Sequence, residues 1–313
     1  MRAAAIDRFG GPAMLTIHSL PVPSPNRGEV LIALHTAGVG GWDAAMRGGW
    51  SPDGRASFPL VLGSDGAGIV AGVGSGVRRF RVGDRVYAYS FNNARGGFYA
   101  EYVAVPAGHV ARIPRRLGLE RAGAVPTTGL TAFQGVDTLG VRKGEAILSH
   151  GASGGVGSLA LQFAKSRGAR VLATASGKKG VSLARRLGAD AAVDGKRRDI
   201  GEAARRFAPG GLDAILALAG GKALTRGLDA LRRGGRLAYP NGIEPEPRKR
   251  RGVEVSSYDA SPGVREFRWF NQAVEAANLR VPIEREYTLA HAAAAHRRLA
   301  RGGVLGKIIL RIR

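Results

Sequence analysis

Gly151-Ala-Ser-Gly-Gly-Val-Gly157 is the stretch of sequence that decides the fold of the second half of this chain. It follows an apolar run, Ala146–Ser149, that predicts a β-strand. Apolar residues then recur at helical spacing, at Val156, Leu159, Ala160 and Phe163. A strand, a glycine turn and a helix in this order present backbone N–H groups and a helix dipole to a pyrophosphate. The pattern predicts dinucleotide binding; the alternative is a plain strand–helix turn in a flavodoxin-like fold.

The region around this turn alternates apolar strand candidates with helical stretches, which indicates βαβ units and a parallel sheet. Further strands are expected at 170–174, 191–193, 212–217, 235–239 and 253–257. With the strand before the turn, they match a doubly wound α/β sheet.

The first third of the chain has a different pattern. Short apolar stretches such as Val30–Leu34, Ala67–Val73 and Tyr99–Val105 are separated by turn residues, which favours a barrel or a sandwich. After Ser261, helices are expected over 267–277 and 290–299, and a last strand over 307–312.

The end of the second predicted strand indicates which dinucleotide binds. Enzymes that use NAD usually place an acidic residue there to bind the ribose hydroxyls. Here the sequence is Thr174-Ala-Ser-Gly-Lys-Lys179, with no acid. Ser176, Lys178 and Lys179 could instead bind a 2′-phosphate, so NADPH is predicted as the cofactor. The alternative is a solvated lysine pair at the start of a helix.

Composition excludes some kinds of site. The chain has no cysteine, so disulfides, thiolate nucleophiles and Cys-ligated metals are excluded. No apolar run reaches the length that spans a bilayer, and a soluble cytoplasmic protein is expected. The net charge is +23, from 47 Lys and Arg against 24 Asp and Glu. These basic residues are scattered along the sequence and have no aromatic residues between them on which bases could stack. Nucleic-acid binding is therefore kept as an alternative to the dinucleotide-dependent function, and the positive charge itself is not assigned a role.

Motifs along almost the whole chain resemble the medium-chain dehydrogenase/reductase superfamily, and within it the zinc-independent quinone oxidoreductase-like enzymes. Besides the glycine turn, these motifs are Gly38-Val39 through Asp43, Pro59-Leu-Val-Leu-Gly-Ser-Asp-Gly-Ala-Gly68, Val82-Gly-Asp-Arg-Val86, Gly97-Phe-Tyr-Ala-Glu-Tyr-Val103, Pro126-Thr-Thr-Gly-Leu-Thr-Ala132 and Gly306-Lys-Ile308.

The resemblance implies a domain organisation. A GroES-like β-barrel catalytic domain is expected over 1–118, a Rossmann NADP-binding domain over 119–260, and a C-terminal return to the catalytic domain over 261–313. The cofactor is expected in the cleft between the domains. A homodimer is also implied, through pairing of the edge strand Val253–Ser257 across a two-fold axis.

The resemblance also implies a set of cofactor-binding residues. Thr128 and Asn241 are expected near the nicotinamide, and Lys307 is a weaker candidate whose alternative is a surface lysine at a strand edge. The remaining predicted cofactor contacts are Gly151, Ser153, Gly154, Gly155, Val156, Gly157, Ser176, Lys178, Lys179, Leu218, Ala219 and Gly220.

Four positions depart from the family pattern. Gly40 stands where zinc relatives have a catalytic cysteine and quinone oxidoreductases have asparagine, and Ser64-Asp65 replaces a His-Glu pair. No metal is therefore expected. The phosphate-binding lysine of relatives falls at Gly180, so which lysine here reaches the phosphate stays open.

No general acid stands out. Tyr89, Tyr99 and Asp43 are weak candidates, each of which also suits a structural role. The substrate pocket is expected to be walled by Trp42, Trp50 and Phe91. The predicted activity is hydride transfer to a quinone or a similarly activated acceptor. The alternatives are an enone or enal reductase that uses NADPH, and a nucleotide-sensing, RNA-binding relative without robust turnover.

Overall fold

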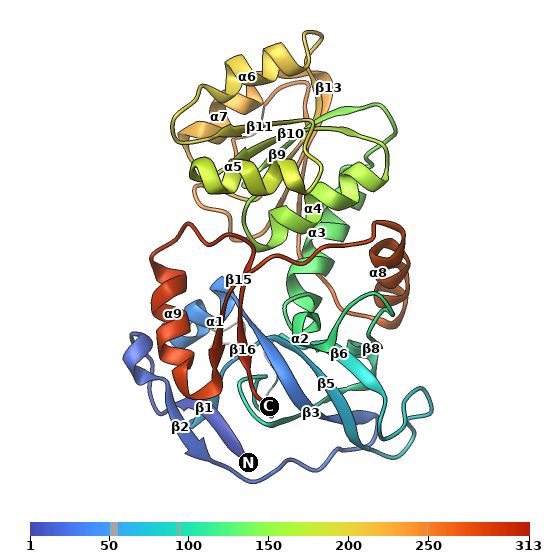
Figure 1. The fold of residues 1–313 in the computed structure, drawn as a ribbon, viewed down its shortest axis with the longest axis vertical. Coiled ribbons are helices and arrows are strands. Elements are labelled where there is room, and N and C mark those ends of the chain that lie inside the picture. The colour runs from blue at the N-terminus through green and yellow to red at the C-terminus, as the bar shows by residue number, and fades with distance from the viewer. Residues whose placement is uncertain (51–55, 92, 94, 249) are drawn as a thin grey trace. The chain divides into compact units, whose positions relative to one another are not determined.

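The computed structural model describes residues 1–50, 56–91, 93, 95–248 and 250–313 (Figure 1). The chain folds into two compact units. The barrel unit contains residues 1–127, 262–272 and 283–313, and the Rossmann unit contains residues 128–261 and 273–282.

These units differ from the expected domain ranges at Ser261, which belongs to the Rossmann unit, and in two longer segments. Residues 119–127 belong to the barrel unit, where the Thr36 hydroxyl donates to the Leu119 carbonyl at 3.2 Å. Residues 273–282 belong to the Rossmann unit, where Gln162 exchanges two hydrogen bonds with the Arg280 backbone, at 2.9 and 2.8 Å. Polar contacts of this kind are not visible in a hydrophobic pattern.

The Rossmann unit contains a parallel sheet in the order β11-β10-β9-β12-β13-β14. Its strands are β9 (Ala146–His150), β10 (Arg170–Ala175), β11 (Ala191–Asp194), β12 (Leu212–Ala217), β13 (Leu231–Pro240) and β14 (Glu254–Tyr258). Its helices are α4 (Gly155–Ser166), α5 (Gly177–Arg186), α6 (Ile200–Phe207) and α7 (Lys222–Leu228), with α3 (Pro126–Thr138) beginning near the division between the units.

This strand order confirms the doubly wound prediction. The chain runs from β9 outward to β11, then returns to β12 and continues to β14 on the other side. Because parallel crossovers are right-handed, the two directions place their helices on opposite faces of the sheet. The central strand β9 is buried at every position, as expected for a strand covered on both faces.

The barrel unit contains two sheets and confirms the predicted GroES-like domain. The larger sheet has the order β15-β16-β3-β5-β6-β8, with β7 also paired to β3, and the smaller has the order β2-β1-β4. The strands are β1 (Arg2–Ile6), β2 (Thr16–Ser19), β3 (Glu29–Val39), β4 (Leu60–Val61), β5 (Asp65–Val73), β6 (Arg85–Tyr89), β7 (Tyr102–Pro106), β8 (Val110–Arg112), β15 (Ile283–Thr288) and β16 (Lys307–Arg311). The helices are α1 (Gly41–Arg47), α2 (Leu119–Ala122) and α9 (Ala292–Ala300), with short 3₁₀ turns at Pro12–Met14, Ala107–His109 and Leu289–His291. Helix α8 (Val264–Ala276) begins in this unit, and its residues from 273 on belong to the Rossmann unit.

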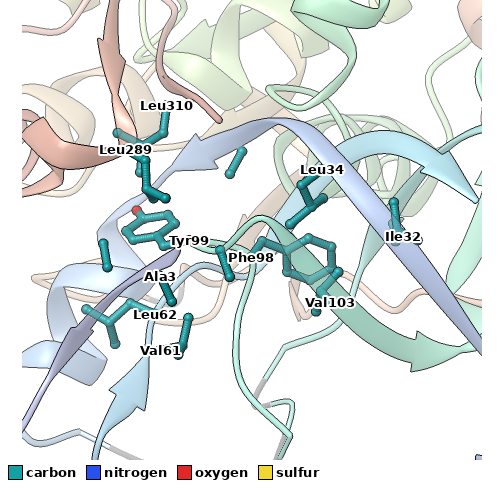
Figure 2. Packing of buried hydrophobic residues seen from close by; sticks show 14 of the residues in the cluster. Ala3, Ile32, Leu34, Val61, Leu62, Phe98, Tyr99, Val103, Leu289 and Leu310 are labelled. Carbon is teal, nitrogen blue, oxygen red and sulfur yellow. The ribbon is translucent and has the colours of Figure 1, made fainter. Parts of the chain in front are cut away.

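Alternation along β3 builds the core of the barrel unit. Val30, Ile32 and Leu34 are fully buried, while the residues between them are only partly so. Figure 2 shows Leu34 and Ile32 in the same cluster as Phe98 and Tyr99. Burying each large apolar side chain contributes about 1.5–3 kcal/mol, so this cluster stabilises the frame on which the functional residues lie.

The C-terminal strand β16 completes the barrel sheet. It pairs antiparallel with β3, with Ile308 opposite Val39. This pairing brings Lys307 beside the end of β3, where α1 begins. Among the described residues, no helix combines the length and the apolar character needed to cross a membrane.

Candidate functional site

The glycine turn between β9 and α4 has the geometry that its sequence predicts. Gly151 has a φ of +88°, in the left-handed region that favours glycine. A Cβ on Gly157 would lie 2.2 Å from the Gly151 carbonyl oxygen and 2.7 Å from Ala152 Cα, so a side chain cannot fit there. Gly154 caps α4, and a Cβ there would have Gly151 O as its nearest described neighbour, at 3.6 Å. The first N–H groups of a helix lack partners within it, so this turn suits an anionic pyrophosphate.

Ser153 connects the glycine turn to the end of β10. Its hydroxyl accepts a hydrogen bond from the Ser176 N–H at 3.2 Å, so the predicted pyrophosphate and 2′-phosphate residues are neighbours. Lys178 and Lys179 are exposed in the first turn of α5. Gly180 is buried, and a Cβ there would lie 3.2 Å from both Cβ and Oγ of Ser153. A longer side chain at 180 would crowd Ser153, so this turn favours glycine where relatives carry a lysine. The phosphate-binding roles of Ser176, Lys178 and Lys179 stay predictions.

The ends of β12 and β13 lie at the same edge of the sheet as the glycine turn. The Leu218 N–H donates to the His150 carbonyl at 3.0 Å, which places Leu218 beside Gly151, and Ala219 and Gly220 follow it along the chain. Asn241 follows β13 and lines a hollow of about 270 Å³. Doubly wound sheets bind ligands at the carboxyl ends of their strands, where the strand order reverses.

Three further predicted contacts lie on helices. Gly155 and Val156 form the first turn of α4, and Thr128 is buried on α3. Their contacts with a cofactor stay predictions, as does the contact predicted for Asn241.

Asp43 is a buried carboxylate at the start of α1 in the barrel unit. Its Oδ2 accepts the backbone N–H of Gly40 at 2.8 Å, which caps the helix. Its Oδ1 accepts the Ser64 hydroxyl at 2.8 Å, and the Tyr99 hydroxyl donates to Oδ2 at 3.0 Å. Three donors therefore satisfy this carboxylate inside the protein.

Asp65 and Lys307 add two opposite charges to the surroundings of Asp43. Asp65 Oδ2 accepts the backbone N–H of Thr127 at 2.8 Å. Lys307 is only 6% exposed, and its Nζ donates to the Val39 carbonyl at 3.2 Å. Burial raises the pKa of both carboxyls, and the charge of Asp65 raises that of Asp43 further. The positive charge of Lys307 opposes the rise in both.

Tyr99 continues the hydrogen-bonded chain away from Asp43. Its hydroxyl lies 3.2 Å from His296 Nε2, and His296 Nδ1 lies 2.9 Å from Arg47. The Tyr99 ring is fully buried in the core of the barrel unit (Figure 2). Burial raises the pKa of Tyr99 well above its usual value. Burial, aided by the charge of Arg47, lowers the pKa of His296 to about 3, so both side chains are neutral at pH 7.

The three predicted pocket aromatics contact one another. The Trp42 and Trp50 rings have centroids 5.2 Å apart, and Phe91 lies 5.6 Å from each. Trp50 is 43% exposed, so the group presents an aromatic face to solvent. Tyr89, the other predicted tyrosine, is only 7% exposed at the end of β6. The catalytic roles of Tyr89, Tyr99 and Asp43 stay predictions.

The positions of the zinc ligands of relatives hold a different set of groups here. Gly40 has no side chain, and the Ser64 hydroxyl donates to Asp43. Within the part of the chain that the structure describes, no group of three or more His, Cys, Asp or Glu side chains could hold a metal ion.

Sequence reasoning did not find the buried cluster in the barrel unit, which includes Arg47, His296 and the Lys307 ammonium. One signal for His296 was present, because Ala292, Ala295 and His296 share the buried face of α9. Lys307 gave no such signal. Residues 307–310 of β16 are all buried, so no alternation shows where the lysine points.

Comparison with known proteins places both units in one family. Residues 26–115 match the model of the alcohol dehydrogenase GroES-like domain, and residues 155–247 match the model called zinc-binding dehydrogenase. The chain is 31% identical over 324 aligned residues to human quinone oxidoreductase, which covers 99% of this chain and 97% of that protein. This chain belongs to the medium-chain dehydrogenase/reductase superfamily.

Solved structures of the superfamily agree with this membership. A structure described as an NAD-dependent alcohol dehydrogenase has a TM-score of 0.92 and 33% identity, with all of both chains covered. A mycobacterial structure complexed with NADPH has a TM-score of 0.87 and 29% identity, again with all of both chains covered. As a quinone oxidoreductase-like member of the superfamily, the chain is an oxidoreductase with a nicotinamide cofactor.

Proposed function

We propose that this enzyme uses NADPH and no zinc, and that it transfers a hydride to a quinone or a similarly activated acceptor. The observation that carries the proposal is the hydrogen bond that connects the glycine turn to the end of β10. There, Ser153 holds the backbone of Ser176, and residues 174–179 contain no acid that would favour NADH. The similarity to human quinone oxidoreductase and to a mycobacterial protein complexed with NADPH supports the same conclusion.

The residues of the Rossmann unit fit a dinucleotide with a 2′-phosphate. Gly157 allows the helix to start close to the strand, and Gly154 leaves space for a close approach to the backbone. The N–H groups of the first turn of α4 would hold the pyrophosphate. Ser176, Lys178 and Lys179 would hold the 2′-phosphate through charge-assisted hydrogen bonds. NADPH bound there would supply the hydride.

The residues of the barrel unit support an acceptor that needs no metal. A quinone delocalises the added electrons onto its oxygens, so orientation and exclusion of water matter more than a Lewis acid. The face formed by Trp42, Trp50 and Phe91 offers ring surfaces to a planar acceptor. Zinc independence is supported by Gly40 and by the Ser64 hydroxyl, which is committed to Asp43.

Cofactor choice is tested by removing the two lysines of α5. Each charge-assisted hydrogen bond contributes about 1.5–3 kcal/mol, and the exposure of these side chains reduces that value. We expect the double variant Lys178→Ala/Lys179→Ala to lower kcat/KM for NADPH about 10-fold and to leave the value for NADH unchanged. Lys143→Ala, an exposed lysine before β9, is the matched control. A wild-type preference for NADH, or equal losses with both cofactors, would contradict the NADPH assignment.

The acceptor is tested with a panel of quinones and α,β-unsaturated carbonyls, followed by NADPH absorbance. Turnover of quinones alone supports the proposal, whereas turnover of enones or enals alone would assign the alkene reductase activity. Retention of RNA at physiological salt, with no turnover of any acceptor, would assign the RNA-binding alternative.

Two further parts of the proposal concern assembly and location. The edge position of β14 supports a homodimer that pairs this strand with its copy, and a cytoplasmic location is also proposed.

A further inference from the structure

Lys307 is a buried cation with unused hydrogen-bonding capacity. An ammonium group has three N–H donors. Within the described residues, the Lys307 ammonium makes one hydrogen bond, to Val39 O. The nearby carboxylates do not use the other donors, because Asp43 accepts from three other groups and Asp65 accepts from Thr127 N. Because buried donors are rarely left unpaired, the remaining N–H groups point to a ligand.

The absence of a side chain at Gly40 leaves space beside the Lys307 ammonium. A Cβ built on Gly40 would lie 3.9 Å from Lys307 Nζ and 3.6 Å from Asp43 Oδ2, and both distances are ordinary contacts. Gly40 is half-buried and Gly41 is exposed, so the glycine beside Nζ is itself partly open to solvent. An atom placed in this space can contact Nζ without displacing a side chain at position 40.

We propose that Lys307 donates a hydrogen bond to the oxygen of the hydride acceptor and stabilises the negative charge that forms there. The inference rests on the proposed function. The acceptor takes up a hydride, which is two electrons and one proton, while the reduced nicotinamide is oxidised by the same two electrons. The product is an anion with its charge on oxygen, and one proton from water then completes the reduction. Lys307 contacts that oxygen and is not consumed.

The surrounding charges are compatible with this role. The negative charges of Asp43 and Asp65 act on the Lys307 cation through the field and not through a direct hydrogen bond. The charge of Asp43 is shared among its three hydrogen-bond donors, and Arg47 lies at the other end of the same chain, beyond Tyr99 and His296. An oxygen that enters beside Gly40 is therefore within reach of the ammonium, and the charge of the neighbouring Asp43 is offset by the three donors that bond to it.

The test separates the acceptor from the cofactor. We expect Lys307→Met to lower kcat/KM for the quinone about 10²-fold, as found when one donor to a developing oxyanion is removed. The Kd for NADPH, measured by fluorescence titration, is expected to stay within about twofold, since the inference assigns Lys307 to the acceptor and not to the cofactor. Lys143→Met is the matched control and is expected to leave both values unchanged. A weaker NADPH Kd with unchanged quinone kinetics would assign Lys307 to the cofactor and overturn the inference.

A second variant covers the case in which Lys307→Met does not fold. Gly40→Val fills the space beside Nζ, and its extended backbone, at φ −130° and ψ 167°, accepts a β-branched residue. We expect the same loss in kcat/KM with an unchanged NADPH Kd. Unchanged quinone kinetics in this variant would overturn the inference.

A direct binding probe distinguishes failure of this inference from failure of the proposed function. 4-Nitrophenol absorbs differently when ionised, so its absorbance reports whether the bound form is the phenolate. We expect the wild type to favour the bound phenolate and Gly40→Val to lose this preference, whether or not any quinone is turned over. If wild type turns over no acceptor but binds the phenolate, the proposed function fails alone. If the wild type shows no preference for the phenolate, the inference fails.

Discussion

Replacing Gly157 by alanine should damage the Rossmann unit, because a methyl group there meets backbone. The new Cβ would lie 2.2 Å from Gly151 O, well inside the 3.4 Å at which ordinary contact begins, and neither partner is a side chain that could rotate away. Overpacking of this kind costs about 1–3 kcal/mol, and the rigid neighbours favour the upper end. Alanine regains up to about 1 kcal/mol of helix propensity. We expect a net loss of about 2 kcal/mol, which lowers Tm by about 4–8 °C for a domain of this size.

Gly154 in the same turn should respond differently. An alanine Cβ there would have Gly151 O at 3.6 Å as its nearest described neighbour, so Gly154→Ala is expected to keep the wild-type Tm. Its methyl group would still occupy the space that a pyrophosphate needs, so the Kd for NADPH should rise about 10-fold or more. Calorimetry and fluorescence titration measure the two effects, and Gly210→Ala, at an exposed glycine with open space, is the control. Equal Tm values for Gly157→Ala and Gly154→Ala would refute the reasoning.

Three other predictions concern pH, the buried cluster and assembly. Burial lowers the pKa of His150 to about 4, below its unfolded value of 6.5, so the unfolded chain binds a proton that the folded chain does not. The free energy of unfolding therefore decreases as pH falls from 6.5 to 4, by about 3 kcal/mol for this side chain. In His150→Asn, the urea midpoint should decrease less over this pH range. An equal decrease in the variant and the wild type would contradict this cause. Tyr99→Phe removes a hydrogen-bond donor to Asp43 and should lower the free energy of unfolding, measured with urea, by about 1–3 kcal/mol. Loss of turnover at unchanged stability would instead favour Tyr99 as a general acid. Ser257→Lys places a charge on the exposed edge strand β14 and should shift a dimer to monomer in light scattering; an unchanged mass would place the interface elsewhere.

The Rossmann unit could be predicted because its signals are local. Gly151 must adopt a positive φ and Gly157 must lack a side chain, and both needs are met by residue type at fixed positions. The strand at the sheet edge was expected over 253–257 and lies over 254–258, a shift of one residue. Boundaries of this kind depend on hydrogen bonds that residue types alone do not determine.

The barrel cluster could not be predicted because its members meet through long-range pairing. Lys307 and Val39 are separated by 268 residues, and their contact depends on β16 pairing with β3. A lysine is usually exposed, so its type favours the surface. The carboxylates that surround it, Asp43 and Asp65, also suit helix caps and turns when considered singly. Only their shared position in the fold shows that three ionisable groups lie together.

The pairing of β16 with β3 has a consequence for how the protein is made. The Rossmann unit is an uninterrupted stretch of chain except for residues 273–282, so most of it leaves the ribosome before the barrel can be finished. The barrel sheet is completed by β16, which comes after every other strand of that sheet in the sequence, and until it is made Thr36–Val39 of β3 lacks the strand on that side. Any chain that ends early therefore has an open sheet edge that can pair with other chains. The same strand carries Lys307, so the buried cation reaches Val39 only after β16 has been synthesised and has paired with β3.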